Sequence, residues 1–336
     1  MSGNTALPTA LPSKLKQRAE LLRCIRRFFD DRGFIEVQTP VLSADTIVDR
    51  FVEPLPVEDA TLPVTHHGDR RYFLQTSPEF AMKRLLSAGM ERIYQIGPVF
   101  RKGDRGRFHN VEFTMLEWYR IGENYLGAMD FLAELIHCTA ERFGRKPSIA
   151  MSGFSDLFQK HTDLDPHRAS CRQFKAFADR RGIFYPDSYP LSGVEDRDLW
   201  IDLLFAESVQ PKLDATIVYD YPGTQSQLAQ LRTVNDSESD YVVAERFELF
   251  LNGIEIANGY NELLDADELR HRFKKTQRNR IFDGQASLPV ESRLLTAMET
   301  GLPPCCGTAL GIDRLLMVLF NAESIDEVLA FPIERA

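Results

Sequence analysis

Cysteine is scarce in this sequence, and its few positions follow none of the patterns that make cysteine structural. Five cysteines occur in 336 residues, and no two of them form a C-x-x-C motif. The odd number and the missing spacing argue against a zinc ribbon and a disulfide framework, and they fit a reducing cytoplasm. The adjacent pair Cys305–Cys306 is best explained as two small apolar side chains before a buried strand.

Long apolar runs and a secretory leader are absent as well. The N-terminal segment MSGNTALPTALPS contains no basic region and no apolar run, so it does not read as a signal peptide. No window approaches the roughly 20 apolar residues that a membrane-spanning helix needs. We therefore expect no association with a membrane.

Positive charge is too sparse for a protein that grips a long nucleic acid. The net charge is −9, and the densest positive stretch runs from Arg270 to Arg280, on a predicted helix. Proteins that bind tRNA or DNA tightly usually carry a basic face, so we expect no tight tRNA binding. The sequence also contains no P-loop, no nucleophilic serine or cysteine motif, and no histidine cluster that suggests a metal.

What is present is an ordinary apolar fraction of 43%, which is enough for a sizeable core.

Residues 1–12 are rich in Pro, Thr and Ala and predict a flexible arm. Residues 13–336 then predict one domain, in which the less legible stretch 145–232 is an internal insertion. Apolar spacing and end signals predict helices near 13–33, 77–89, 124–143, 171–181, 196–207 and 265–282. Strands that pair as hairpins, with helices packed outside, predict an α+β fold with an antiparallel sheet flanked by helices.

The most informative stretch is FRKGDRGRFHNVEFTMLEWYR, residues 100–120. Arg101 follows an apolar strand that ends at Phe100, and a polar loop with glycine comes next. A second strand then carries Glu112, Phe113, Glu117 and Tyr119. This pattern predicts a hairpin with a long loop. The arginine, a loop histidine and two carboxylates suit a nucleotide phosphate together with a substrate that carries an ammonium group.

A second hairpin is predicted around Asn252–Gly253, a strong two-residue turn signal. Such a turn pairs Phe250 with Glu255, and it places Glu248 on the same face, diagonally across from Glu255. Two carboxylates on one face can bind a hard cation. Two exposed strand acids are the simpler alternative that these residues alone leave open.

The 100–120 stretch resembles motif 2 of the class II aminoacyl-tRNA synthetases, and EFTMLEWYR within it resembles the lysyl branch. GTALGIDRLLMVLF (307–320) resembles motif 3, FELFLNGIEIANGYNEL (247–263) resembles the segment between motifs 2 and 3, and GFIEVQTPVLS (33–43) resembles motif 1. The four matches stand in family order over roughly residues 15–336. No HIGH or KMSKS signature of the class I synthetases is present.

The resemblance implies roles for particular residues. Arg101 and Arg314 are the expected catalytic charges, since the family uses them at the α-phosphate and over adenine, opposite Phe113. The further expected ATP contacts are Lys102, Gly103, Asn110, Glu255, Ile256 and Gly311. The expected ligands of the Mg²⁺ of ATP are Glu248 and Glu255. The expected amino-acid pocket comprises Ser77, Pro78, Glu79, Glu117, Tyr119, Glu262 and Ala309. Glu79 would face the amino group near the carboxylate, whereas Glu117, Tyr119 and Glu262 would hold the distal ammonium.

Three positions depart from the family pattern. Gly103 stands at the position where the family usually has a glutamate after the motif 2 arginine. Asp104 is the neighbouring acid that could take over the role of that glutamate. Val111 stands at a position where proline is common. Ala309 stands where lysyl-tRNA synthetases usually carry glycine. One additional methyl group there is expected to reshape the pocket near the α-carbon of the substrate.

The motif 1 helix is predicted to begin near residue 13, which leaves no room before it for the anticodon-binding domain of a lysyl-tRNA synthetase. The chain is therefore similar to free-standing paralogues of that enzyme that act on translation elongation factor P. This resemblance implies activation of lysine or (R)-β-lysine with ATP and Mg²⁺, transfer to a lysine ε-amine of the factor, and a homodimer formed through motif 1. The alternatives are a truncated lysyl-tRNA synthetase, a small-molecule amino-acid ligase, or a catalytically inactive regulatory paralogue.

Overall fold

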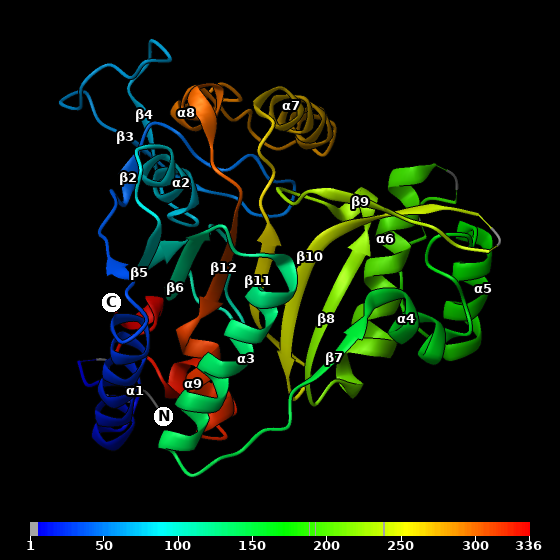
Figure 1. Cartoon of the computed structure of the whole chain (residues 1–336), viewed down its shortest axis with the longest axis horizontal. Helices are drawn as coiled ribbons and strands as arrows, with labels where there is room; N and C mark the ends of the chain where they lie inside the picture. Colours follow the sequence, from blue (N-terminus) through cyan, green and yellow to red (C-terminus); the bar gives the residue numbers. More distant parts are fainter. Residues whose placement is uncertain (1–5, 188, 192, 238) are drawn as a thin grey trace. The chain divides into compact units, whose positions relative to one another are not determined.

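The computed structural model describes residues 6–187, 189–191, 193–237 and 239–336 (Figure 1). The chain divides into two compact units, Met1–Lys146 with Leu263–Ala336, and Pro147–Glu262. The second unit begins close to the start of the expected insertion and continues through the hairpin around Asn252–Gly253. The division into an arm, one domain and an insertion stays a prediction.

The first unit contains the elements expected from motifs 1, 2 and 3. Its helices are α1 (Pro12–Asp30), α2 (Glu79–Ser87), α3 (Tyr125–Arg142), α7 (Ala266–Phe282), α8 (Arg293–Gly301) and α9 (Ile312–Leu319). Its strands are β1 (Ile35–Glu36), β2 (Leu42–Ser43), β3 (Leu55–Glu58), β4 (Arg71–Leu74), β5 (Arg92–Phe100), β6 (Glu112–Ile121) and β12 (Cys305–Gly311).

The strands β1, β5, β6 and β12 lie next to one another in that order. The pairs β5–β6 and β6–β12 are antiparallel, as expected from hairpins. The edge strand β1 runs parallel to β5, a detail that the sequence prediction missed. The chain leaves β1, forms the small sheet β2–β4–β3 and helix α2, and only then returns to β5 in the same direction.

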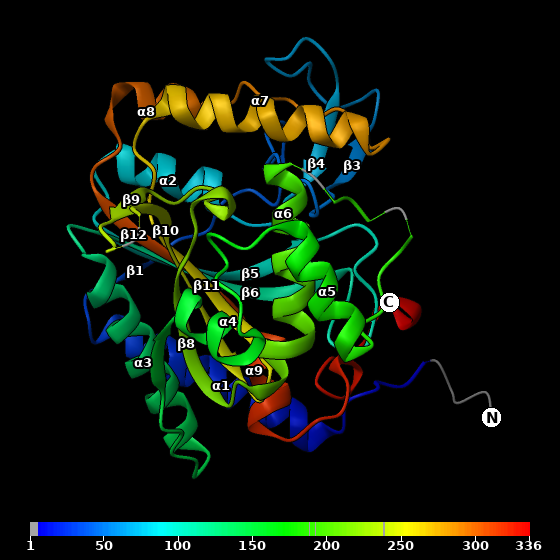
Figure 2. The ribbon, with the colours of Figure 1, turned by 90° about the vertical axis from the view of Figure 1, so that its right-hand side faces the viewer.

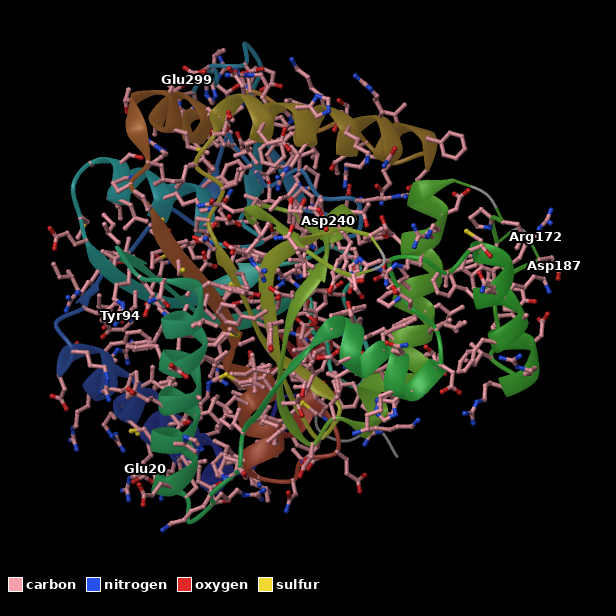
Figure 3. The ribbon with its side chains drawn as sticks, turned by 45° about the vertical axis from the view of Figure 1, so that its right-hand side comes forward. Glu20, Tyr94, Arg172, Asp187, Asp240 and Glu299 are labelled. Carbon is pink, nitrogen blue, oxygen red and sulfur yellow. The ribbon has the colours of Figure 1, made fainter. Side chains whose placement is uncertain are left out.

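One face of β6 belongs to the core of the first unit. The ring of Trp118 lies 5.5 Å from that of Phe29 on α1 and 6.1 Å from that of Phe131 on α3. Helices α1 and α3 lie side by side over this face (Figure 1). Tyr94 of β5, labelled in Figure 3, stacks on Phe29 with 4.6 Å between the ring centroids. Because side chains alternate along a strand, Glu117 and Tyr119 point to the other face.

Helices α2, α7 and α8 lie together in the first unit, and Figure 2 shows α7 lengthwise beside α8. Arg270 of α7 donates to Glu291 and Glu299, and the second of these acids lies on α8 (Figure 3). The N-terminal segment also belongs to this unit. The amides of Thr9 and Ala10 donate to the carbonyls of Ala330 and Leu329 at 2.9 and 3.1 Å. Residues 1–5 of the predicted arm lie outside the described residues.

The second unit is a smaller α+β body. Its helices are α4 (Phe154–Thr162), α5 (Cys171–Arg181) and α6 (Val194–Leu204), and its strands are β7 (Ala150–Gly153), β8 (Ala215–Pro222), β9 (Leu231–Val234), β10 (Tyr241–Leu251) and β11 (Ile254–Asn261). The strand order is β11–β10–β8–β7, with β9 paired to β10. Strand β7 runs parallel to β8 because α4, α5 and α6 return the chain to its starting end. The predicted antiparallel sheet flanked by helices is confirmed, and β1–β5 and β7–β8 are parallel pairs that the sequence did not reveal.

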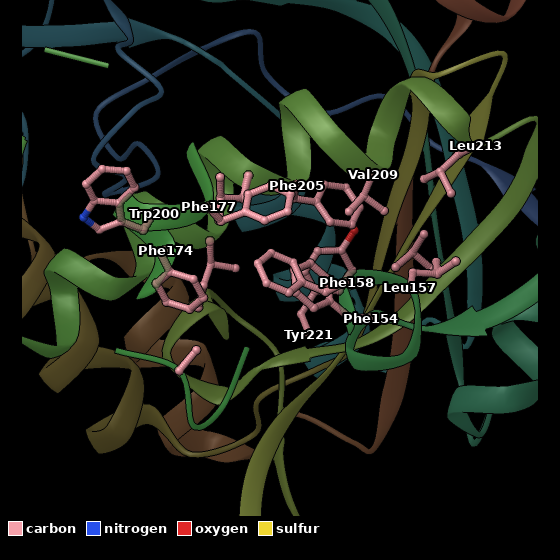
Figure 4. Close-up of a cluster of buried hydrophobic side chains, with 14 of the residues drawn as sticks. Phe154, Leu157, Phe158, Phe174, Phe177, Trp200, Phe205, Val209, Leu213 and Tyr221 are labelled. Carbon is pink, nitrogen blue, oxygen red and sulfur yellow. The ribbon is translucent and has the colours of Figure 1, made fainter. Parts of the chain in front are cut away.

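Aromatic side chains fill the space between these helices and the sheet of the second unit (Figure 4). Phe154 of α4 stacks on Phe205 with 4.9 Å between centroids, and Tyr221 of β8 lies 4.8 Å from Phe154. This core fixes β8, which holds β10 in place by seven register pairs from Ala215 to Pro222. Among the described residues of both units, no helix is long and apolar enough to cross a membrane.

Candidate active site

The face of β6 and β12 that lies opposite Trp118 carries the first group of predicted substrate residues. Glu117 is almost fully buried at 2% exposure. Its two carboxylate oxygens accept hydrogen bonds from the hydroxyls of Ser77 and Tyr119, both at 2.7 Å. Ser77 also accepts the amide of Glu79 at 3.0 Å, so the start of α2 and strand β6 are joined through one serine hydroxyl.

Burial, followed by the charge of the nearby Glu79 carboxylate, raises the pKa of Glu117 to about 7. The hydroxyls of Ser77 and Tyr119 and the ammonium of Lys83 act in the opposite direction, because they favour the charged form. A carboxylate that titrates near neutral pH inside a protein is a strong candidate for a functional group.

Lys83 is a functional candidate that the sequence prediction missed. Its ammonium donates to Glu79 at 2.6 Å, and the two side chains are 1% and 9% exposed. Lys83 follows Glu79 by one helical turn on α2, a spacing that could have suggested the pair. Glu79, predicted to face a substrate amino group, therefore already has a cation of the protein beside it. The helix itself begins at Glu79 with Pro78 in the capping position, one residue later than predicted.

Ala309 lies directly opposite Glu117 in the register of β12 and β6. Opposite residues of neighbouring strands share a face, with their Cβ atoms roughly 5 Å apart, so the methyl group of Ala309 is on the face of Glu117. Gly311 lies opposite Met115 on the same face, and it precedes α9 as its capping residue. The assignment of Ala309 and Glu117 to different ends of the substrate stays a prediction.

Arg101 leaves β5 at the start of the motif 2 loop. Its guanidinium lies over the ring of Phe113, 5.1 Å from the centroid, and its buried Nε has no hydrogen-bond partner among the described residues. The amide of Lys102 donates to the carbonyl of Glu53 at 2.8 Å. An arginine that is held by stacking and retains an unused donor is suited to bind an anion.

Gly103 has a φ of +83°, and no atom lies within 4 Å of the position that a Cβ would occupy. The turn after Arg101 therefore uses the left-handed backbone conformation, which glycine adopts without strain. This geometry gives a physical reason why the usual glutamate is absent at position 103.

Arg314, on the first turn of α9, contacts the motif 2 loop. Its guanidinium donates to the ring nitrogen of His109 at 2.6 Å and to the carbonyl of Phe108 at 3.3 Å. His109 was not among the expected site residues, yet its imidazole contacts Arg314 directly. The predicted stacking of Arg314 over adenine opposite Phe113 stays a prediction, since Arg101 is the arginine that lies over Phe113.

Asn110 is buried, and both ends of its amide are engaged with the backbone. It donates to the carbonyl of Glu112 at 2.7 Å and accepts the amide of Ile333 at 3.2 Å. This side chain thus fixes the C-terminal segment against the motif 2 hairpin. Its predicted contact with ATP would use the remaining amide hydrogen.

A polar network that the sequence did not reveal joins all three motifs. Arg18 of α1 forms an ion pair with the buried carboxylate of Asp313 on α9 and donates to Thr114 Oγ1 at 2.6 Å. The other oxygen of Asp313 accepts the amide of Thr114 at 2.7 Å. Asp313 therefore fixes the position of the helix that carries Arg314.

The predicted hairpin in the second unit is confirmed at its turn. Asn252 and Gly253 have φ values of +52° and +72°, and the strands pair Leu251 with Ile254 and Phe250 with Glu255. Beyond these pairs the register shifts, so that Leu249 pairs with Ala257 and Ile256 is passed over. This β-bulge was not predicted. Glu248 consequently lies opposite Asn258.

The bulge keeps Glu248 and Glu255 on one face, because Glu255 is opposite Phe250 and Phe250 is two residues from Glu248. Burial raises the pKa of Glu248, and the charge of Glu255 raises it further while Arg246 opposes the shift. Glu248 accepts the hydroxyl of Tyr221 at 2.6 Å and pairs with Arg246. Neither Tyr221 nor Arg246 was predicted.

Two mutually repelling carboxylates on one face fit a hard divalent cation, because its charge would relieve the repulsion and carboxylate oxygens retain free lone pairs. The donor set of Glu248 and Glu255 is therefore compatible with Mg²⁺. Glu262, the residue after β11, is 1% exposed, and its carbonyl accepts the side chain of Gln230 at 3.0 Å.

Comparison with known proteins gives a consistent result over the whole chain. Residues 8–335 match the family described as tRNA synthetases class II (D, K and N). A Klebsiella pneumoniae (strain 342) protein named elongation factor P–(R)-beta-lysine ligase is 40% identical over 336 residues, which is 98% of each chain. Proteins of the same name from Pectobacterium carotovorum and Proteus mirabilis are each 39% identical over 98% of both chains. The chain therefore belongs to the class II tRNA synthetase (D, K and N) family, as motifs 1 to 3 suggested.

Proposed function

We propose that the protein is an ATP-dependent ligase that activates (R)-β-lysine and transfers it to a lysine ε-amine of translation elongation factor P in the cytoplasm. The observation that carries the proposal is the buried carboxylate of Glu117, oriented by Ser77 and Tyr119 on the face that Ala309 shares. A buried carboxylate suits a substrate with a distal ammonium group, because an unpaired buried ammonium is costly. The names of the relatives support the acceptor and the amino acid.

In the first step, the carboxylate of the amino acid attacks the α-phosphate of ATP, and the bond to pyrophosphate breaks. Arg101, held over Phe113 with an unused Nε donor, neutralises the charge that develops on the α-phosphate. Arg314, positioned by His109 and by the Asp313 network, binds the nucleotide. Glu248 and Glu255 would hold Mg²⁺, which supplies positive charge to the phosphates.

In the second step, the neutral ε-amine of the acceptor lysine attacks the acyl carbonyl, AMP leaves, and an amide bond forms. The protein supplies no covalent nucleophile in this scheme. Its contribution is to orient both reactants and to stabilise charge.

The test is ATP–pyrophosphate exchange with α-lysine and (R)-β-lysine side by side, followed by the intact mass of elongation factor P after incubation. We expect faster exchange with (R)-β-lysine and a mass increase of one lysyl residue on the factor. Efficient charging of tRNA-Lys, with no modification of the factor, would instead support a truncated lysyl-tRNA synthetase. No exchange with either amino acid would support an inactive paralogue.

The metal ligands are tested by Glu255→Gln, which keeps the size of the side chain and removes its charge. We expect the variant to fold normally and to lose adenylate formation at every Mg²⁺ concentration. Glu207→Gln changes an exposed acid of the same unit and serves as the matched control with normal activity. Near-normal exchange in folded Glu255→Gln protein would remove the metal assignment.

A further inference from the structure

Two adjacent histidines and an aspartate distant in the sequence meet in the first unit, and none of the three has a role in the site described above. Asp45 follows β2, whereas His66 and His67 lie in the connection between β3 and β4. The Nε2 atoms of His66 and His67 lie 3.0 and 3.2 Å from the same atom, Oδ1 of Asp45. All three potential ligand atoms lie within 4.8 Å of one another.

These separations match a tetrahedral metal site. Zinc binds imidazole nitrogen and carboxylate oxygen at roughly 2.0–2.1 Å, so two ligand atoms of a tetrahedron lie roughly 3.3 Å apart. The two histidine–aspartate separations are within a few tenths of an ångström of that value. Two nitrogens and one oxygen are also a donor set that zinc accepts, with a fourth position left for water.

The aspartate is held in place by groups other than the histidines. Asp45 is 3% exposed, and its Oδ2 accepts the amide of Arg293 at 3.2 Å. Its carbonyl accepts the side chain of Gln75 at 2.9 Å. The guanidinium of Arg293 lies 3.8 Å from Oδ2. The buried carboxylate is thus oriented with Oδ1 toward the imidazoles. Among these contacts, the guanidinium of Arg293 is the one positive group, and its charge would weaken the binding of a cation.

The histidines are set by a tight turn. The amide of Thr65 donates to the carbonyl of Asp69 at 2.6 Å, and the amide of His67 donates to Thr65 Oγ1 at 3.2 Å. The two imidazole rings lie 3.8 Å apart between centroids. The sequence prediction saw no histidine cluster that suggests a metal, because Asp45 is remote from His66 and His67 in the chain.

We infer that Asp45, His66 and His67 form a binding site for a divalent transition metal of the zinc class, with water at the fourth position. The ion binds the Nε2 atom of each imidazole and Oδ1 of Asp45. It pins the β3–β4 connection to the segment after β2. That segment continues to Glu53, whose carbonyl accepts the amide of Lys102, so the ion stabilises the support of the motif 2 loop.

The experiment uses the full chain without an affinity tag, stripped of metal with a chelator and then given ZnCl₂. Zinc per chain is measured by mass spectrometry after gel filtration, and affinity by competition with a chromophoric chelator. We expect about one zinc per chain in the wild type. His66→Gln and His67→Gln should each weaken binding by more than the roughly 10–100-fold that loss of an indirect contact costs. His161→Gln changes a histidine outside the cluster and should bind zinc like the wild type.

A competing site must be excluded, because the thiols of Cys24 and Cys138 lie 3.9 Å apart. The Cys24→Ser variant should therefore keep its zinc, and the Co²⁺-loaded protein should show no thiolate charge-transfer band. Trypsin cleavage at Arg70 and Arg71 should slow on addition of zinc in the wild type and not in His66→Gln. Equal zinc content in the wild type and a folded His66→Gln/His67→Gln double variant would overturn the inference, and so would loss of the zinc in Cys24→Ser.

Discussion

In Glu117, side chains of the protein itself already orient the carboxylate that is expected to bind the substrate ammonium. Its carboxylate is buried, yet two hydroxyls of the protein already donate to it. Since burial raises its pKa to about 7, the free protein exchanges a proton there near neutral pH. A substrate ammonium can pair only with the deprotonated carboxylate, so binding of the amino acid and loss of this proton are coupled.

We expect affinity for (R)-β-lysine to rise as the pH increases from about 6 to about 8, since this range spans the folded pKa. Calorimetry in buffers of different ionisation enthalpy should show release of about one proton on binding below pH 7. In Glu117→Gln, binding should be weaker and nearly independent of pH, while the exposed Glu112→Gln should behave like the wild type. Proton release that persists in Glu117→Gln would assign the titration to another group.

The same shift has a consequence for stability without substrate. The folded pKa of Glu117 lies above the usual value of 4.5, so its contribution to stability is fully present below about pH 4.5 and is lost as the pH rises through about 7. Glu117→Gln, which cannot ionise, should therefore flatten the pH dependence of the unfolding free energy over this range. Denaturant titrations of the wild type and of Glu117→Gln at several pH values measure this pH dependence of the unfolding free energy.

Ala309 is the residue at which we expect the choice of amino acid to be made. In a β-amino acid the amino group lies one carbon farther from the carboxylate, and a methylene-scale difference in fit is worth roughly 1–3 kcal/mol, or about 10–200-fold. Ala309→Gly should shift the ratio of kcat/KM values toward α-lysine by a factor in that range. Ala150→Gly, at an exposed position of β7, is the matched control. Equal discrimination in the Ala309→Gly variant and the parent would exclude Ala309 as the determinant.

At the scale of elements, the turn after β5 shows how backbone conformation restricts sequence. Gly103 requires a positive φ, and a side chain there costs about 1 kcal/mol even in open space. We expect Gly103→Ala to raise KM for ATP several-fold with little change in the amino-acid KM. Gly106→Ala is the control, because Gly106 lies in the same loop, also with nothing near its Cβ position and without a positive φ. Unchanged ATP kinetics in Gly103→Ala would show that the turn tolerates other conformations.

Elements with strong local signals were predictable from the sequence. The amphipathic pattern from residue 13 became α1, and Asn252–Gly253 became a turn with positive φ at both residues. The bulge at Ile256 was not predictable, because β10 also pairs with β8 and shifts register there between Ala244 and Phe247. A register shared among several strands is a property of the sheet, and no local pattern contains it.

The site residues also divide into those with a local sequence signal, which were predictable, and those that depend on tertiary contacts, which were not. Motif positions such as Glu117 and Arg101 could be named from the sequence, since their spacing is local. Lys83, Arg246 and the Arg18–Asp313 pair were missed, and the last of these joins residues from opposite ends of the chain. Such contacts depend on how helices and strands come together, so only a structure reveals them.

At the scale of the whole molecule, motif 1 predicts a homodimer. The edge strand β1 leaves Ile35 at 57% exposure, which is consistent with a surface that another copy could cover. We expect analytical ultracentrifugation at micromolar concentration to give a dimer, and Ile35→Lys to weaken it by placing a charge in the interface. Ile333→Lys changes another exposed apolar residue, 43% exposed, and is the control. A fully active monomer at that concentration would refute the prediction.

Arg18 belongs both to the expected dimer interface and to the network that supports Arg314. It lies on the helix that motif 1 assigns to the interface, and it binds the carboxylate that positions the helix of Arg314. A genetic screen for inactive variants would therefore recover substitutions in α1 whose kinetic defect is in nucleotide binding. Geneticists mapping such alleles would see two clusters, one near each end of the coding sequence, and suppressors of one cluster should be found in the other.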